Sequence, residues 1–180
     1  MESLPLDQRL AHEGPFQEHW YRFVGGNFAC GRTVLDVGAA SGYGLEILSW
    51  AGALDVMGID PLPLGPRVRQ VPIEQIQSKS WDLVTALDVI EHVPDDAAFF
   101  AELVRVARWG IFLSTPNWHV WRAANPLHAR EYRPEELLAL LGGRSHQAWT
   151  SGNDLVVSFA PGGLSPDLVE PPNFGIFVRV

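Results

Sequence analysis

The sequence is poor in cysteine, in basic residues and in long apolar runs. Its 180 residues include one cysteine, Cys30, which excludes an internal disulfide and a cysteine-based zinc site. No apolar run approaches the roughly 20 residues that a membrane-spanning helix needs. Thirteen lysines and arginines against 21 aspartates and glutamates give a formal net charge of −8. Because nucleic acid is bound largely by neutralising its phosphates, this balance argues against a partner made of long nucleic acid.

The chain has the length and composition of one globular domain spanning 1–180. At 47% hydrophobic residues, it can bury about 70% of the surface that its unfolded form exposes. The first residues, MESLPLDQRLAHEG, have neither a basic start nor an apolar core, so we expect no signal peptide and a cytoplasmic location. Residues 1–30 are predicted to form an amino-terminal helical segment, with an amphipathic helix in 15–30 that ends at Gly25 and Gly26.

Short apolar runs alternate with amphipathic segments along the rest of the chain. Strands are predicted at 33–38, 55–60, 81–87 and 110–116, and further strands in HQAWTS, LVVSF and NFGIFVRV. Helices are predicted from about Tyr43 to Gly52, after Asp95, and over 133–143. This alternation is typical of a mostly parallel sheet that is covered on both faces. Three prolines in PLPLGPRV, after the second strand, indicate that the expected crossover helix is short or missing.

The stretch VLDVGAASGYG is a predicted strand followed by a glycine-rich turn. In open α/β sheets, ligands bind beyond the carboxyl ends of the strands. A dinucleotide fold has G-x-G-x-x-G there, whereas here the spacing is G-x-x-x-G-x-G and Ala40 replaces the second dinucleotide glycine. Ala40 and the nearby Asp36 argue against a pyrophosphate ligand, and Asp36 suits a cationic one. Gly38 and Gly42 are also compatible with a tight turn that serves only helix–strand packing.

This turn resembles the first motif of the class I S-adenosylmethionine-dependent methyltransferases. VMGIDP is similar to the second strand of that family, WDLVTALDVIEHVPDD to its fourth-strand motif and FLSTPN to its fifth strand. HAREYRPEELLALL resembles the following segment in the branch that includes ubiquinone- and menaquinone-pathway enzymes. The resemblance covers about residues 15–145. It implies a single methyltransferase domain with a Rossmann-like, doubly wound, mostly parallel seven-stranded sheet and an antiparallel carboxyl-terminal strand.

The same resemblance implies that the chain uses S-adenosyl-L-methionine to methylate an acceptor, which we expect to be a small molecule. It places Asp60 at the ribose, whose two hydroxyls would donate charge-assisted hydrogen bonds to the carboxylate. The implied cofactor-binding residues are Asp36, Gly38, Ala39, Gly42, Asp60, Pro61, Ile73, Leu87 and Asp88. Members often carry an acid that contacts the adenine amino group, but Pro72 and Ile73 stand nearest that position here. Adenine would then be held by the Ile73 backbone and apolar packing, or by Glu74.

A second constellation follows the third predicted strand. The candidate catalytic residues are Asp88, expected near the methyl group of the cofactor, His92 as a general base, and His128 in a later loop. Some relatives hold a divalent metal with an acid-x-x-Glu-His stretch, whereas in many others the residue equivalent to Glu91 caps a helix. We predict no metal. Because methyl transfer relies heavily on alignment, an obligatory catalytic side chain is not required.

Several interpretations stay open from the sequence. His128, Arg130 and Tyr132 line the acceptor site or merely seal it, and Trp118 and Trp121 shape an apolar acceptor pocket or serve packing. The alternatives to a small-molecule methyltransferase are a nucleotide-dependent oxidoreductase, a non-catalytic cofactor-binding module, and a metal-dependent RNA or quinone-type O-methyltransferase. The spacing of the glycine turn argues against the first, and charge and length argue against an RNA enzyme. The altered adenine wall and the missing helix keep the second open.

Overall fold

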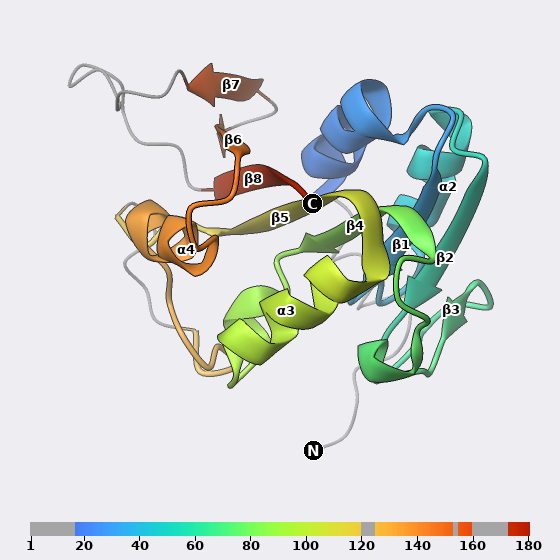
Figure 1. Cartoon of the computed structure of the whole chain (residues 1–180), viewed down its shortest axis with the longest axis horizontal. Helices are drawn as coiled ribbons and strands as arrows, with labels where there is room; N and C mark the ends of the chain where they lie inside the picture. Colours follow the sequence, from blue (N-terminus) through green and yellow to red (C-terminus); the bar gives the residue numbers. More distant parts are fainter. Residues whose placement is uncertain (1–16, 120–124, 153–154, 160–172) are drawn as a thin grey trace.

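One mixed sheet organises the protein (Figure 1). The computed structural model describes residues 17–119, 125–152, 155–159 and 173–180, and the account below concerns these residues. The sheet has eight strands in the order β3-β2-β1-β4-β5-β8-β6-β7. The strands span β1 (Thr33–Val37), β2 (Asp55–Ile59), β3 (Val68–Arg69), β4 (Trp81–Leu87), β5 (Ala107–Pro116), β6 (His146–Gly152), β7 (Leu155–Phe159) and β8 (Asn173–Arg179).

Strand directions confirm the predicted fold class. Strands β1 to β5 pair in parallel, and β8 lies antiparallel between β5 and β6. The predicted run LVVSF forms β7, which pairs with β6 at the edge. The eighth strand is the two-residue β3, which pairs with β2 and which the sequence did not predict. The sheet is therefore Rossmann-like and mostly parallel, with an antiparallel carboxyl-terminal strand.

Helices cover both faces of the sheet, as a doubly wound fold requires. The helix over residues 17–24 and α2 (Tyr43–Trp50) pack on one face, where the core includes Trp20, Leu48 and Phe112. The other face is covered by α3 (Asp96–Val106) and α4 (Pro134–Leu140). Figure 1 shows α3 and the amino-terminal helix on opposite sides of the sheet. Within the described ranges, no helix combines the length and the apolar character needed to cross a membrane.

The predicted end of the amino-terminal helix at Gly25 and Gly26 is wrong. The helix continues as a π-helical turn over Gly25–Ala29. A Cβ on Gly25 would lie 2.8 Å from the Cβ of Ala51, so the glycine lets this turn approach the end of α2 closely. Tertiary packing thus overrides the breaking tendency of two successive glycines. Residues 15 and 16, at the predicted start of this helix, lie outside the described residues.

The crossover helix after β2 is missing, as the sequence predicted. Residues 60–80 are all described, and they contain β3 and a single 3₁₀ turn, η2 (Ile73–Gln75), but no α-helix. The prolines at 61, 63 and 66 remove backbone donors and clash with a helical path, which accounts for this irregular connection.

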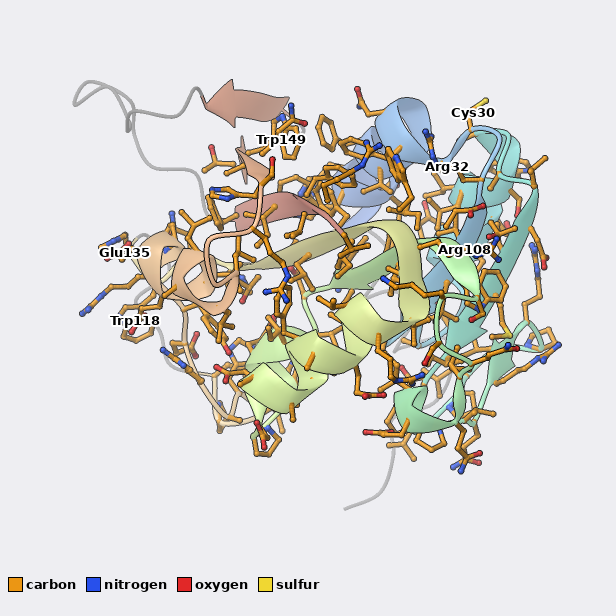
Figure 2. All side chains as sticks on the ribbon, viewed as in Figure 1. Cys30, Arg32, Arg108, Trp118, Glu135 and Trp149 are labelled. Atoms are coloured by element: carbon orange, nitrogen blue, oxygen red, sulfur yellow. The ribbon has the colours of Figure 1, made fainter. Side chains whose placement is uncertain are left out.

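Aromatic side chains fill the face under the amino-terminal helix. Trp149 of β6 lies there with its ring centroid 5.0 Å from that of Phe23 (Figure 2). Phe28 stacks on Phe177 of β8 with a centroid distance of 4.6 Å. The carboxyl-terminal strands therefore contribute to the core that holds the amino-terminal helix in place.

Candidate functional site

The glycine-rich turn follows β1 and needs its small residues. Gly38 and Gly42 both have φ of +78°, and Ala40 has φ of +44°, a region that residues with a Cβ rarely adopt. A Cβ on Gly38 would lie 2.4 Å from Cγ2 of Val89, so the close approach of the turn to the end of β4 also requires glycine. The amides of Gly38 and Ala39 donate to the Ile59 carbonyl, which fixes the turn beside the end of β2.

Asp60 stands directly after β2 and organises the neighbouring loops. Its Oδ2 accepts a hydrogen bond from the Ala40 amide at 3.0 Å, and its Oδ1 accepts one from the Leu62 amide at 2.7 Å. Each carboxylate oxygen has two lone pairs, so both oxygens keep acceptor capacity for a ligand hydroxyl. Asp60 therefore sets the geometry of the turn and is chemically suited to grip a diol.

A cavity of about 420 Å³ opens beside Asp60, beyond the carboxyl ends of β1 and β2. This volume lies within the range of small-molecule sites, in which a few polar groups among apolar walls orient the ligand. Its apolar walls include Val37, Ile59, Val71, Ile73, Val89, Val93 and Phe99, and its polar lining includes Asp60, Gln70 and Glu74. Four of the predicted cofactor residues, Gly38, Asp60, Pro61 and Ile73, line this one cavity.

Sequence reasoning missed the wall that Phe99, Val89 and Val93 provide. Phe99 lies in the helix predicted after Asp95, where an apolar residue at helical spacing indicates burial against the sheet. The same position also faces the cavity, which only the placement of α3 reveals. The nearest local signal was the Glu-His segment, which lies between Val89 and Val93 in the sequence.

Asp36 lies beneath the turn instead of at the cavity. It is 1% exposed, and its two oxygens accept hydrogen bonds from Tyr21 Oη at 2.8 Å and Thr85 Oγ1 at 2.6 Å. Burial raises the pKa of the Asp36 carboxyl to about 6, although both hydroxyl donors lower it. Asp36 thus ties the amino-terminal helix to the centre of the sheet. Its predicted contact with the cofactor stays a prediction.

The amino-terminal helix covers the other end of the turn. Gln17 donates from Nε2 to the Leu87 carbonyl at 3.1 Å. The ring of Tyr21 packs on Gly44, where a Cβ would lie 2.0 Å from Tyr21 Cε1. Ala39 faces a small gap between this helix and the turn. The predicted residues Ala39 and Leu87 therefore meet the amino-terminal helix, and Gly42 shapes the turn.

The end of β4 carries two acidic residues in contrasting environments. Asp88 has φ of +54°, and its Oδ1 accepts a hydrogen bond from Ser114 Oγ at 2.6 Å. Glu91, in the 3₁₀ turn η3 (Ile90–His92), is 1% exposed. Burial and the neighbouring Asp88 charge raise the pKa of the Glu91 carboxyl well above its usual range. This environment therefore favours the protonated form of Glu91.

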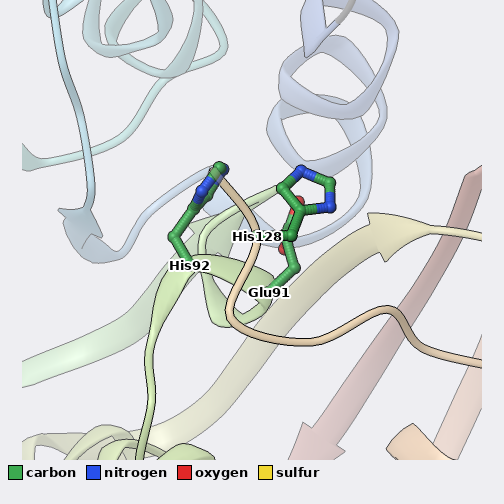
Figure 3. A group of neighbouring side chains, drawn as sticks. All are labelled: Glu91, His92 and His128. Atoms are coloured by element: carbon green, nitrogen blue, oxygen red, sulfur yellow. The ribbon is translucent and has the colours of Figure 1, made fainter. Parts of the chain in front are cut away.

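Glu91, His92 and His128 come together although 36 positions separate the two histidines (Figure 3). One ligand atom from each lies within 4.8 Å of the others, and a carboxylate with two imidazoles suits several divalent metals. Glu91 Oε2 has no hydrogen-bond partner among the described residues. Both ring nitrogens of His128 do have partners, Glu131 at 2.9 Å and Asn125 at 3.1 Å. The cluster therefore accommodates a metal only if His128 gives up one of these partners.

The loop that carries His128 is fastened to the protein at two places. The amides of Ala129 and Arg130 donate to the Glu91 carbonyl. Tyr132 is 1% exposed and donates to Asp96 at 2.6 Å, and Arg130 contacts the same carboxylate at 2.8 Å. Because Tyr132 is buried, it fits the interpretation in which this loop seals the acceptor site and not the one in which it lines that site. Trp118 is half-buried, and Trp121 lies outside the described residues.

Comparison with known proteins agrees with this geometry. A family model described as "Methyltransferase domain" matches residues 15–149. A ubiquinone biosynthesis O-methyltransferase of Bordetella avium is 32% identical over 174 residues, covering 84% of this chain and 69% of that protein. A protein of the same name from Acinetobacter baumannii is 33% identical over 123 residues, covering 57% of this chain and 51% of that protein.

Solved structures show the same fold. A SAM-dependent methyltransferase from Archaeoglobus fulgidus aligns with a TM-score of 0.68 at 16% identity, over 96% of this chain and 99% of that one. Magnesium protoporphyrin IX methyltransferase from Synechocystis, solved with bound S-adenosylhomocysteine, aligns with a TM-score of 0.64 at 17% identity, over 99% of this chain and 89% of that one.

Proposed function

Because this chain belongs to the class I S-adenosylmethionine-dependent methyltransferases, we propose that its cofactor occupies the cavity beside Asp60 and that its acceptor is a small molecule bearing a hydroxyl group. The cofactor of this family is S-adenosyl-L-methionine. The single observation that carries this placement is the cavity. Its walls are largely apolar, and its lining includes the carboxylate of Asp60, which directly follows strand β2. The relatives named as O-methyltransferases of ubiquinone biosynthesis support the nature of the acceptor.

The cavity suggests how each part of the cofactor is held. The two ribose hydroxyls donate to the free lone pairs of Asp60, as charge-assisted hydrogen bonds. Adenine packs between Ile73 and Phe99, whose side chains line the apolar part of the cavity. The methionine portion runs along the turn at Gly38 toward the amino-terminal helix. Pro61 and Glu74 border the adenine and ribose end.

The reaction that we propose is a displacement at a methyl carbon. When bound, S-adenosyl-L-methionine supplies an electrophilic methyl group on a sulfonium, and the acceptor oxygen loses its proton as the new bond to carbon forms. Alignment of the reactants contributes much of the rate in such a transfer. Leu87 ends β4, Asp88 follows it, and both would border the approach of the acceptor. Asp88, His92 and His128 stay the candidates for accepting the proton.

Calorimetry with S-adenosylhomocysteine tests the placement. Replacing Asp60 with alanine removes two charge-assisted hydrogen bonds, so we expect a loss of about 2–4 kcal/mol of binding free energy, or about 30- to 1,000-fold in Kd. Asp60→Asn keeps the side-chain volume and one acceptor oxygen, so its loss should be smaller. Asp55→Ala is the matched control, because Asp55 is exposed at the opposite end of β2. A wild-type protein that does not bind S-adenosylhomocysteine contradicts the proposal, as does an Asp60→Ala variant with unchanged affinity.

A transfer assay tests the acceptor class. The protein is incubated with S-adenosyl-L-methionine labelled in the methyl group, together with separate pools of hydroxylated aromatic compounds, amines and RNA. We expect label in the hydroxylated compounds. Label found only in the amines or the RNA would contradict a small-molecule O-methyltransferase.

A further inference from the structure

The connection between β2 and β4 forms one wall of the cavity, and a side chain of α3 fastens it. Arg105 lies in the last turn of α3. Its Nη2 donates to the Ile73 carbonyl at 2.9 Å, and its Nη1 donates to the Ile76 carbonyl at 2.7 Å and to Ser78 Oγ at 3.0 Å. One guanidinium therefore satisfies acceptors at both ends of the 3₁₀ turn whose first residue, Ile73, lines the cavity.

A carboxylate holds the Arg105 guanidinium in this orientation. Glu102, one turn earlier in α3, accepts from Arg105 Nε at 2.9 Å and lies 2.7 Å from Nη2. The hydrogen bond to Glu102 is the largest of the effects that raise the pKa of Arg105 above its usual range. Arginine has five N–H donors in a rigid fork, so it can serve Glu102 and three acceptors of the connection together.

The far end of the same connection is fastened separately. The amides of Lys79 and Ser80 donate to the carbonyls of Arg105 and Val106, and Lys79 Nζ donates to the Ala107 carbonyl at 2.8 Å. These contacts hold the start of β4, which lies away from the cavity. Residues 60–80 form no α-helix, so the connection itself supplies no helix to support its Ile73 end. The side chain of Arg105 takes over the support that a crossover helix would give to the cavity wall.

We propose that Arg105 is a positioning residue for the adenine part of the cofactor, acting through the turn at Ile73. This inference rests on the proposed function, since it requires adenine to pack against Ile73. Arg105 does not line the cavity. It holds the backbone of the turn that places Ile73 at the cavity, and Phe99 of the same helix lines that cavity too, so Arg105 would fix the position of Ile73 relative to Phe99 and thereby the space left for adenine.

Substitution of Arg105 tests the proposal in the full chain. Arg105→Gln removes the charge and the fork, and we expect the Kd for S-adenosylhomocysteine to rise about tenfold, equivalent to about 1.4 kcal/mol. Arg105→Lys keeps the charge but not the fork, so its Kd should fall between those of the wild type and Arg105→Gln. Arg108→Gln is the matched control: Arg108 donates to the Ser80 carbonyl of the same connection, far from Ile73.

Two further readouts separate positioning from general stability. The ratio of the Kd values for S-adenosylhomocysteine and its inosine analogue should move closer to one in Arg105→Gln. Hydrogen exchange of the backbone amides over 73–78 should become faster in the same variant. Neither should change in Arg108→Gln. If the glutamine variant does not fold, the lysine variant provides the same comparisons.

The outcomes are distinguishable from failure of the proposed function. Absence of S-adenosylhomocysteine binding by the wild type overturns the proposed function. Wild-type binding together with unchanged affinity and discrimination in both Arg105 variants overturns the role of Arg105 alone. An equal loss of affinity in Arg108→Gln overturns it as well, because the effect would then follow from weakening the whole connection.

Discussion

Replacing Tyr21 with phenylalanine is expected to destabilise the protein more at pH 8 than at pH 5. Tyr21 Oη donates to Asp36 Oδ2 at 2.8 Å, and both residues are buried. The pKa of Asp36 is raised to about 6, so the carboxyl is ionised in the folded protein at pH 8 and mostly protonated at pH 5. The hydrogen bond therefore has a charged acceptor at one pH and a neutral one at the other.

The size of the effect follows from the kind of acceptor. A hydrogen bond to a charged group contributes about 1.5–3 kcal/mol, and a neutral one about 0.5–1.5 kcal/mol. Phenylalanine keeps the ring that packs against Gly44, so the lost hydroxyl is the main change. We expect the free energy of unfolding to fall by about 2 kcal/mol at pH 8 and by about 1 kcal/mol at pH 5. Loss of the Tyr21 hydroxyl as a donor should also raise the pKa of Asp36 further.

Urea denaturation of the wild type and the variant at both pH values measures this difference. Tyr43→Phe is the control. Because Tyr43 is 39% exposed, removing its hydroxyl should change the free energy of unfolding little at either pH. The double variant with Asp36→Asn closes a mutant cycle and should remove the pH dependence of the Tyr21 effect.

An equal loss at pH 5 and pH 8 would refute the reasoning. It would mean that Asp36 does not titrate between these values in the folded state, or that the hydroxyl of Tyr21 does not interact with it. Persistence of the difference in the Asp36→Asn background would place its cause elsewhere.

Three other changes have defined outcomes. The folded-state pKa of Asp36, about 6, lies above its ordinary value of 3.8, so the folded protein holds a proton that the unfolded chain has released. Wild-type stability should therefore fall by about 2 kcal/mol through this group as pH rises from 4 to 7, and Asp36→Asn should remove this contribution in denaturant titrations. Gly44→Ala should cost about 1–3 kcal/mol in the same assay, since its Cβ would overlap Tyr21, whereas Gly26→Ala, with open space around it, should not destabilise. Asp95→Ala should cost about 1 kcal/mol and lower the melting temperature, because Asp95 caps α3.

Several parts of this protein were predictable because local sequence determines them. The run 81–87 became β4 with the predicted bounds, since a buried strand needs only a short apolar run that packs on both faces. The prolines after β2 excluded a crossover helix by removing donors along a few residues. Asp60, Pro61 and Gly38 reached one cavity because the carboxyl ends of adjacent parallel strands share an edge of the sheet.

Contacts between distant segments could not be predicted in this way. One partner of Asp36 is Tyr21, which comes from the amino-terminal helix, 15 positions earlier in the chain. Phe99 lines the cavity and Arg105 fastens its wall only because α3 crosses the connection after β2. The continuation of the first helix through Gly25 depends on its closeness to α2.

Local sequence thus predicted most of the helices and strands, their order, and the residues that follow the central strands. Tertiary packing decided that Phe99 lines the cavity, that the buried Asp36 carboxyl accepts from Tyr21, and that Arg105 supports the cavity wall that lacks a helix. The physical reason is one of range. Periodicity and turn chemistry act over a few residues, whereas burial, pKa shifts and cavity walls arise where segments far apart in the chain pack together.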